Sequence, residues 1–303
     1  MIQKLIIAGK GFCMGAADVV PGVSGGTMAF ILGIYEKLIN AISSFDLIWL
    51  QHVFKLEIKP ALQRPHFGFL IPLVIGIICA LLFFTRIIPL PTLLHTNPEP
   101  IYGLFFGLIL GSIVVLLPET ERFDSSTIFF LTIGTLAGWF IVNLVPMNTP
   151  DTAWFLFLSG MLAISAMLLP GISGSFILLI LHKYETILNG IGHFNFMVLI
   201  PFGLGALTGL VVFSRFLGWL LARFYRATLS VIIGILIGSL WVIWPFQVRK
   251  YIEVHGKEKL ISATPYFPDS FTQPVIYAIL MMLLGIALVL IISEWGKRGQ
   301  QFD

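Results

Sequence analysis

The sequence contains very little charge. Of its 303 residues, 18 are Lys or Arg and 15 are Asp or Glu, so charged residues make up 11%, against ~25% in soluble proteins. Hydrophobic residues account for 57%, and the mean hydropathy is +0.97. So few charges cannot cover the surface of a soluble fold, and the chain is therefore expected to be a polytopic membrane protein.

Cysteines and basic clusters are also scarce. Cys13 and Cys79 both lie in apolar segments, and no disulfide framework or metal-ligand spacing is present, so neither a metal nor another cofactor is expected. The net charge of +3, without a basic run interleaved with aromatics, argues against a nucleic-acid partner. The N-terminus lacks the pattern of a cleavable signal peptide, because Lys10 interrupts its apolar run.

Breaker residues divide the chain into ten apolar segments. Six of them come near the ~20 residues that a helix needs to span a bilayer: 67–88, 100–117, 127–146, 196–219, 228–245 and 274–294. The four shorter segments form two pairs, each interrupted by a Pro-Gly turn: 5–20 with 26–43, and 154–169 with 175–191. Whether these short pairs span the membrane or are re-entrant stays open.

The two short pairs are copies of each other. At an offset of 149 residues, 11 of the 25 positions from 21 to 45 are identical in the second copy. The match continues at offsets of 129 and then 127, because the second half lacks the loop 46–66. The sequence therefore predicts an all-α protein of two repeats, 1–149 and 150–303. Each repeat consists of a short broken pair and three transmembrane helices.

The orientation follows from parity and charge. Each repeat crosses the membrane an odd net number of times, so the second must be inverted relative to the first. Ten Lys and Arg lie on the side of both termini: Lys4, Lys10, Lys55, Lys59, Arg64, Arg122, Arg223, Arg226, Lys297 and Arg298. The other side has four, all in the loop 246–273. Both termini are therefore expected in the cytoplasm, with an interfacial amphipathic helix at 46–60.

The duplicated breaks, Pro21-Gly22 and Pro170-Gly171, are the best pointer to a binding site. Each starts a new half-helix, whose N–H groups and positive dipole end would favour an anion. Hydroxyl and glycine residues beside them would complete a phosphate-sized cradle: Ser24, Gly25, Gly26, Thr27, Ser173, Gly174 and Ser175. The alternative is that each break only turns a hairpin and lets helices pack closely.

Membrane charges are duplicated as well. Arg86, near the outer interface, matches Arg215, near the cytoplasmic one. Each either snorkels at a helix end or gathers a phosphate. Glu36 matches Glu185, and both are either salt-bridge partners or sites that couple transport to protons or a cation such as Na⁺. Asp18, which has no acidic counterpart, is a third coupling candidate.

Residues 14–40, with the string from Asp18 to Thr27 and Tyr35-Glu36, resemble the bacterial polyprenyl-phosphate transporters, and the likeness covers essentially the whole chain. The resemblance implies that undecaprenyl phosphate, the lipid carrier of cell-envelope glycans such as peptidoglycan, is returned from the outer to the cytoplasmic leaflet of the inner membrane. The resemblance also implies which residues form the site. In the first copy they are Asp18, Pro21, Gly22, Ser24, Gly25, Gly26, Thr27 and Glu36, and in the second they are Pro170–Ser175 and Glu185. Alternating access around the cradle would move the phosphate. Membrane lipids are the other expected partners, and homo-oligomerisation stays open.

Two enzyme classes are alternatives. Undecaprenyl-pyrophosphate phosphatases are similar in outline, but hydrolysis would require an arginine inside the loop, where Gly25-Gly26 and Gly174-Ser175 stand, and clustered carboxylates. Residues 22–26 fit the G-x-S-x-G pattern of a hydrolase nucleophile, but the strand–turn–helix context of that motif is missing. Transport is therefore favoured over catalysis.

Overall fold

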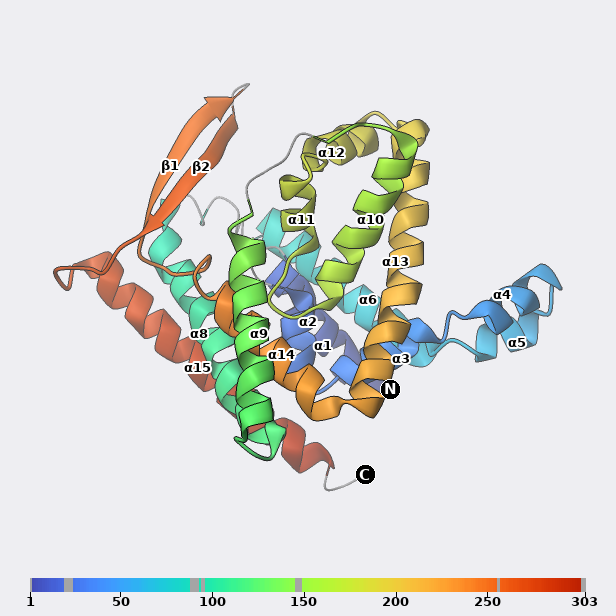
Figure 1. Ribbon diagram of the computed structural model, residues 1–303, viewed down its shortest axis with the longest axis horizontal. Coiled ribbons are helices and arrows are strands. Elements are labelled where there is room, and N and C mark those ends of the chain that lie inside the picture. The colour runs from blue at the N-terminus through green and yellow to red at the C-terminus, as the bar shows by residue number, and fades with distance from the viewer. Residues whose placement is uncertain are drawn as a thin grey trace.

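The computed structural model describes residues 2–18, 24–87, 93, 96–144, 149–254 and 257–300 (Figure 1). The first half forms α1 (Ile2–Asp18), α2 (Gly25–Ile31), α3 (Tyr35–Ser43), α4 (Leu47–Phe54), α5 (Ile58–Gln63), α6 (Phe67–Leu82), the π-helical turn η1 (Phe83–Ile87), α8 (Pro98–Leu116), the 3-10 turn η2 (Leu117–Thr120) and α9 (Ser125–Val142). The second half forms α10 (Ala153–Leu168), α11 (Gly174–Ile180), α12 (Tyr184–Gly192), α13 (Phe196–Arg223), α14 (Tyr225–Ser239), β1 (Gln247–Val254), β2 (Lys257–Pro265) and α15 (Gln273–Gln300). The protein is mostly helical, and the β-hairpin corrects the expectation of an all-α fold.

Four helical stretches are long and apolar enough to cross a membrane: Pro98–Thr120, Ser125–Val142, Phe196–Arg223 and Gln273–Glu294. Two more were expected at this length, but α6 and α14 have only 16 and 15 residues. The reason is that an apolar run does not mark where a helix ends. α6 passes into the π-helical turn at Phe83, and the run after Ser239 continues in turns. The set of apolar helices is that of a polytopic membrane protein.

The connection 246–273, expected as a loop, contains the antiparallel hairpin β1–β2, whose register runs from Gln247↔Pro265 to Val254↔Lys257. β-Branched and aromatic residues favour a strand here: Val248, Tyr251, Ile252 and Val254. The prediction of a loop rested on the charges of this stretch alone and did not consider its strand-forming residues.

The stretch 46–60, predicted as one interfacial helix, is instead part of two short helices, α4 and α5, which project from the bundle as an arm (Figure 1). The chain turns between them at Leu56, whose φ is +56°. Asp46 caps the Trp49 N–H at 2.8 Å and accepts from Arg64 Nε at 2.7 Å, which closes the base of the arm. These donors hold the pKa of the Asp46 carboxyl well below its usual range.

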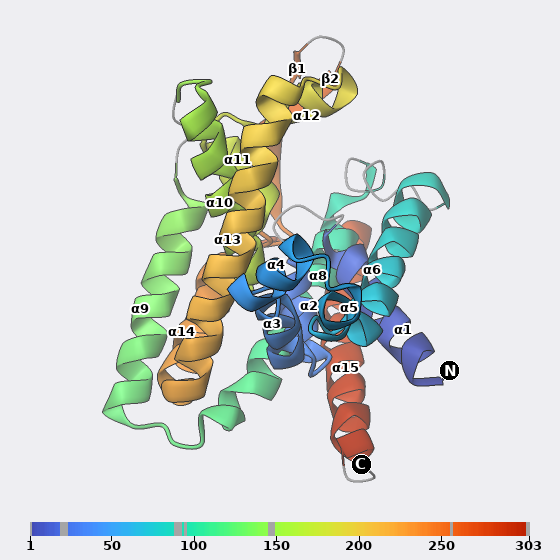
Figure 2. The same cartoon turned by 90° about the vertical axis from the view of Figure 1, so that its right-hand side faces the viewer.

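The duplication of the sequence is repeated in the helices. α2 and α11 have seven residues each and begin 149 positions apart, and the nine-residue α3 and α12 do the same. α1 packs along α6 as α10 packs along α13, and α8 packs along α15 as α14 packs along α9 (Figures 1 and 2). In the last two pairs each half contributes one helix, so the halves are interleaved.

Matched glycines lie where these helix pairs come closest. A Cβ on Gly76 would lie 1.9 Å from a carbonyl oxygen of α1, and one on Gly205 would lie 1.8 Å from a carbonyl oxygen of α10. Gly107 of α8 and Gly234 of α14 approach carbonyls of α15 and α9 in the same way, at 2.1 and 2.3 Å. Because lipid offers no hydrophobic drive for helices to associate, such close backbone contact is what stabilises the pairs.

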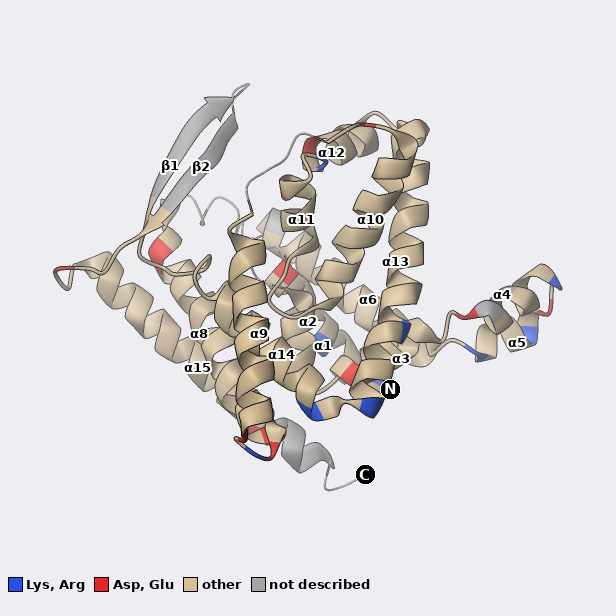
Figure 3. Ribbon diagram, in the orientation of Figure 1, with Lys and Arg blue, Asp and Glu red and all other residues tan. Residues whose placement is uncertain are grey.

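The core of the protein surrounds α2. Every residue of this helix except Phe30 is buried, and the helix contacts α1, α3, α8, α10 and α15. Charged side chains gather mainly at helix ends and in the α4–α5 arm (Figure 3). The first Pro-Gly break therefore leads into a helix that is enclosed by the rest of the bundle.

Candidate functional site

In the interior, the second break lies against the residues that follow the first break. The Gly171 N–H donates to Thr27 Oγ1 at 3.0 Å, and Tyr35 Oη donates to the Leu168 carbonyl at 2.8 Å. Ser24 Oγ donates to the Met167 carbonyl, at the end of α10, at 3.3 Å. All three contacts join residues more than 130 positions apart. The two copies of the motif thus form one structural unit.

The second break turns at Pro170 and Gly171. Pro170 is buried, and Gly171 has a φ of +87°, a left-handed conformation that glycine adopts without strain. A Cβ at this glycine would lie 3.1 Å from Ser239 Oγ, so the break rests on α14. Pro21 and Gly22 of the first break lie outside the described residues.

In the first copy, the protein itself caps the start of α2. The Gly25 N–H donates to Asp18 Oδ1 at 2.7 Å, and the Gly26 N–H donates to Ser24 Oγ at 3.1 Å. Ser24 and Thr27 are each 1% exposed. A carboxylate and a hydroxyl therefore occupy the N–H groups at which the sequence analysis places a phosphate, and the first copy is closed in this structure.

The second copy is open at the same places. Ser173 Oγ and Ser175 Oγ lie 2.8 Å apart, and the Ser173 side chain makes no capping bond to α11. Ser175 is exposed, whereas its counterpart Gly26 is buried. Gly174 is packed tightly, with its Cβ position 2.7 Å from a carbonyl oxygen of α10. Two neighbouring hydroxyl groups at an uncapped helix start can thus receive a polar ligand.

The same asymmetry extends to the helices that follow. α3 packs across the bundle on α13, but the matched pair, α12 and α6, does not pack in this way among the described residues. Ile39 and Ile42 of α3 are 1% and 8% exposed, whereas their counterparts Leu188 and Ile191 of α12 are 50% and 54% exposed. Equivalent residues of the two repeats therefore have different environments.

The matched arginines are placed differently. Arg215 of α13 is half-buried and donates through Nη2 to the Phe45 carbonyl at 3.3 Å, just beyond α3. This bond holds the second half against the first on the side of the α4–α5 arm. Arg86 lies in η1, and its side chain is outside the described part of the chain.

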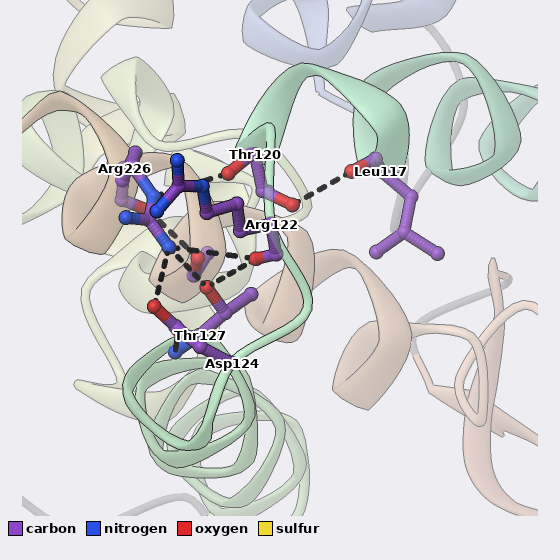
Figure 4. Close-up of polar contacts among 7 residues, drawn as sticks. Leu117, Thr120, Arg122, Asp124, Thr127 and Arg226 are labelled. Carbon is purple, nitrogen blue, oxygen red and sulfur yellow. Dashed lines mark hydrogen bonds and ion pairs between the residues drawn. The ribbon is translucent and has the colours of Figure 1, made fainter.

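A third arginine has a structural role. Arg226, at the start of α14, donates to the Thr120 carbonyl at 3.1 Å, to Asp124 Oδ2 at 2.8 Å and to Thr127 Oγ1 at 3.2 Å (Figure 4). The Thr127 N–H and the guanidinium hold the pKa of the Asp124 carboxyl well below its usual range. Since the loop between α8 and α9 uses these donors, Arg226 fixes that loop to α14.

The coupling candidates Glu36 and Glu185 lie in the first turns of α3 and α12, and both are exposed. An acidic residue at this position interacts favourably with the helix dipole, so both have a local structural role beside the predicted one. The described residues bring no group of three or more His, Cys, Asp or Glu side chains together.

Two buried or half-buried lysines near the two copies of the motif were not predicted as site residues. Lys10, counted among the cytoplasmic charges, lies within α1 and donates to the Leu32 carbonyl at the end of α2, at 2.8 Å. Lys183, only 1% exposed, donates to the Thr149 carbonyl at 2.9 Å and pairs with Asp151 at 2.5 Å. A lysine inside an apolar segment needs an acceptor, and this signal could have pointed to both.

Known proteins are similar in sequence to this chain across most of its length. A family model described as undecaprenyl phosphate translocase-like matches residues 14–261. A polyprenyl-phosphate transporter of Vibrio cholerae serotype O1 is 37% identical over 298 residues, which cover 95% of this chain and 96% of that protein. A polyprenyl-phosphate transporter of Staphylococcus aureus is 35% identical over 256 residues, 78% of this chain and 84% of the relative. No solved structure matches. The chain therefore belongs to the undecaprenyl phosphate translocase-like family, as the motif at 14–40 predicts.

Proposed function

We propose that this protein transports polyprenyl phosphate, and that it returns undecaprenyl phosphate from the outer to the cytoplasmic leaflet of the bacterial inner membrane. Its family and the names of both relatives support this substrate. The observation that carries the proposal is the contact in the interior between the second break and Thr27, which follows the first break; the first copy is closed there and the second exposes two hydroxyl groups. Such interrupted helices near the centre of duplicated halves are typical of transporter binding sites.

In this proposal the repeats 1–149 and 150–303 have inverted topology, with both termini in the cytoplasm. The α4–α5 arm then lies on the cytoplasmic side and the β-hairpin on the outer side. The bond from Arg215 to Phe45 closes the cytoplasmic side, while the exposed face of α12 belongs to the outer side. The asymmetry of the repeats therefore supports an outward-facing state, and exchange of the two environments would give the inward-facing one.

The phosphate head binds first at Ser173, Gly174 and Ser175. Arg86 receives it on the outer side, and Arg215 on the cytoplasmic side once the bond to Phe45 opens. A guanidinium suits both steps, because it can bind a phosphate with two parallel hydrogen bonds.

Asp18 provides a coupling step. Its carboxylate accepts the Gly25 N–H that a phosphate would use, so two negative groups would compete for one donor. Protonation of Asp18, or a cation beside it, would lower this repulsion and free the cradle of Ser24, Gly25, Gly26 and Thr27. Glu36 and Glu185 are the further candidates for such coupling.

Flipping of a labelled lipid phosphate in proteoliposomes tests the proposal. We expect the Ser173→Ala/Ser175→Ala double variant to lose most of the flux. Ser165→Ala is the matched control, because this hydroxyl donates within α10 at 2.7 Å. Equal flux in the double variant and the control would refute the cradle. Release of inorganic phosphate from the pyrophosphate lipid, at a rate matching the flux, would instead favour the phosphatase.

A further inference from the structure

A large apolar cavity opens on the side of the bundle, beside the hairpin. It has a volume of about 660 Å³ and lies between α8, α9, the end of α14 and the segment after β2. Most of the side chains that line it are large and hydrophobic, among them Phe106, Leu136, Trp139, Trp241, Trp244 and Phe267. The volume falls within the ~300–1,000 Å³ that is common for small-molecule sites. The hydroxyl of Thr135, which also lines the cavity, donates to the Leu131 carbonyl of its own helix at 2.9 Å.

The aromatic wall of the cavity is ordered by ring contacts. Trp244 meets Phe106 with ring centroids 5.3 Å apart and Phe267 at 5.4 Å, both edge-to-face. The Trp244 Nε1–H donates to the Tyr266 carbonyl at 3.0 Å. The polar atom of this tryptophan is therefore used outside the cavity, and its apolar surface remains for a ligand.

The cavity is open outward. Leu136, Trp139 and Trp241 are 61%, 51% and 51% exposed, and Phe267 is 82% exposed. Leu136 and Trp139 lie on α9, an apolar helix that we place in the membrane, so this side of the opening faces lipid. A hydrocarbon chain can therefore enter sideways without crossing water.

The cavity also adjoins the second break. Gly171 packs against Ile235, Leu236 and Ser239 of α14, and the next residues on this helix, Ile237 and Gly238, line the cavity. One helix, about 10 Å in diameter, thus separates the break from the cavity. A ligand whose head binds at Ser173 and Ser175 would have its tail leave the protein at this level.

We propose that this cavity binds the polyprenyl tail of the lipid phosphate just beyond its first two isoprene units. The inference rests on the proposed function, because it takes the head-group site from there. A phospholipid fits less well, since its head group stays at the membrane surface while this cavity adjoins a site inside the protein. The tail segment near the phosphate is thus recognised by apolar contact alone.

Binding of two probes to the purified full-length protein tests this inference. One probe is undecaprenyl phosphate, and the other is a phosphate with two isoprene units, too short to reach around α14. Leu136→Trp narrows the cavity from an exposed position, and we expect it to weaken binding of the long probe about tenfold while the short probe is unaffected. Phe140→Ala is the control, because this neighbour on α9 is 62% exposed but does not line the cavity.

A photoreactive group on the third isoprene unit, beyond the length of the short probe, gives a readout that needs no variant. In the wild-type protein it should label the segments around Trp139 and Trp241 more than a phospholipid with the same group does. Equal affinity of Leu136→Trp and Phe140→Ala for the long probe would overturn the tail site, and so would equal labelling by the phospholipid. Failure of the wild type to bind either phosphate probe would instead overturn the proposed function.

Discussion

The bond between the Gly171 N–H and Thr27 Oγ1 gives the sharpest prediction. Thr27→Val keeps the shape of the side chain and removes the acceptor. Since Thr27 is 1% exposed and the contact is buried, no water can replace it without rearrangement. The backbone donor is then left unsatisfied, at a cost of about 1–2 kcal/mol.

This cost applies only to the conformation in which Gly171 contacts Thr27. If the two states of the transporter differ by only a few kcal/mol, about 1.4 kcal/mol changes their ratio about tenfold. We therefore expect Thr27→Val to shift the population away from the present structure as well as to lower its resistance to unfolding.

Unfolding in detergent measures the loss of stability. Labelling of Ser175→Cys, in a Cys13→Ala/Cys79→Ala background, measures the population shift. The control is Thr208→Val, because the Thr208 hydroxyl is exposed and donates within α13 at 2.8 Å. If Thr27→Val matches this control in both assays, the bond does not hold the two copies together and our interpretation of the site is wrong.

Three further predictions concern the supports of the site. Gly205→Ala places a Cβ 1.8 Å from a backbone oxygen of α10 and should lower the unfolding free energy by about 1–3 kcal/mol or more; Gly203→Ala, with nothing within 4 Å, should not, and equal melting curves would contradict the packing. Arg215→Gln removes the guanidinium that bonds the Phe45 carbonyl just beyond α3, so hydrogen exchange of the α3 amides should speed up while α12 stays unchanged; unchanged exchange in α3 would argue against this bond as a closure. The Thr127 N–H and the Arg226 guanidinium lower the pKa of Asp124, so its ionised carboxylate stabilises the folded state above the ordinary Asp pKa of ~3.9 and loses this effect as the pH falls through the lowered value. The stability gap between wild type and Asp124→Asn should thus be full at neutral pH and shrink in acid, and a gap that does not depend on pH would exclude the charge as its cause.

Much of the architecture could be predicted because the duplication is visible in the residues themselves. The match of Pro21–Phe45 with Pro170–Phe194 anticipates the equal lengths of α2 and α11, and of α3 and α12. Such a comparison treats both copies alike, so it could not show that Ser24 is buried while Ser173 and Ser175 are accessible. That difference depends on packing between the copies, which periodicity does not report.

The hydrogen-bond partners of polar residues in the interior could not be predicted from the sequence either. Thr27 was chosen as a donor for phosphate, but it accepts a backbone N–H of the other copy. Lys10 was counted as a loop charge, but it satisfies the carbonyl end of α2. Both residue types need a polar partner inside the protein, and only the three-dimensional contact identifies which partner it is.

The interleaving of the two halves has a consequence for how the protein is made. α8 is synthesised early but packs along α15, which is made after every other helix that the structure describes. Until α15 is made, the close-packing face around Gly107 has only lipid or another protein to contact. The first repeat therefore cannot complete its assembly before α15 is made, and chains truncated before α15 should be targets for membrane quality control even though they contain the whole of the proposed head-group site.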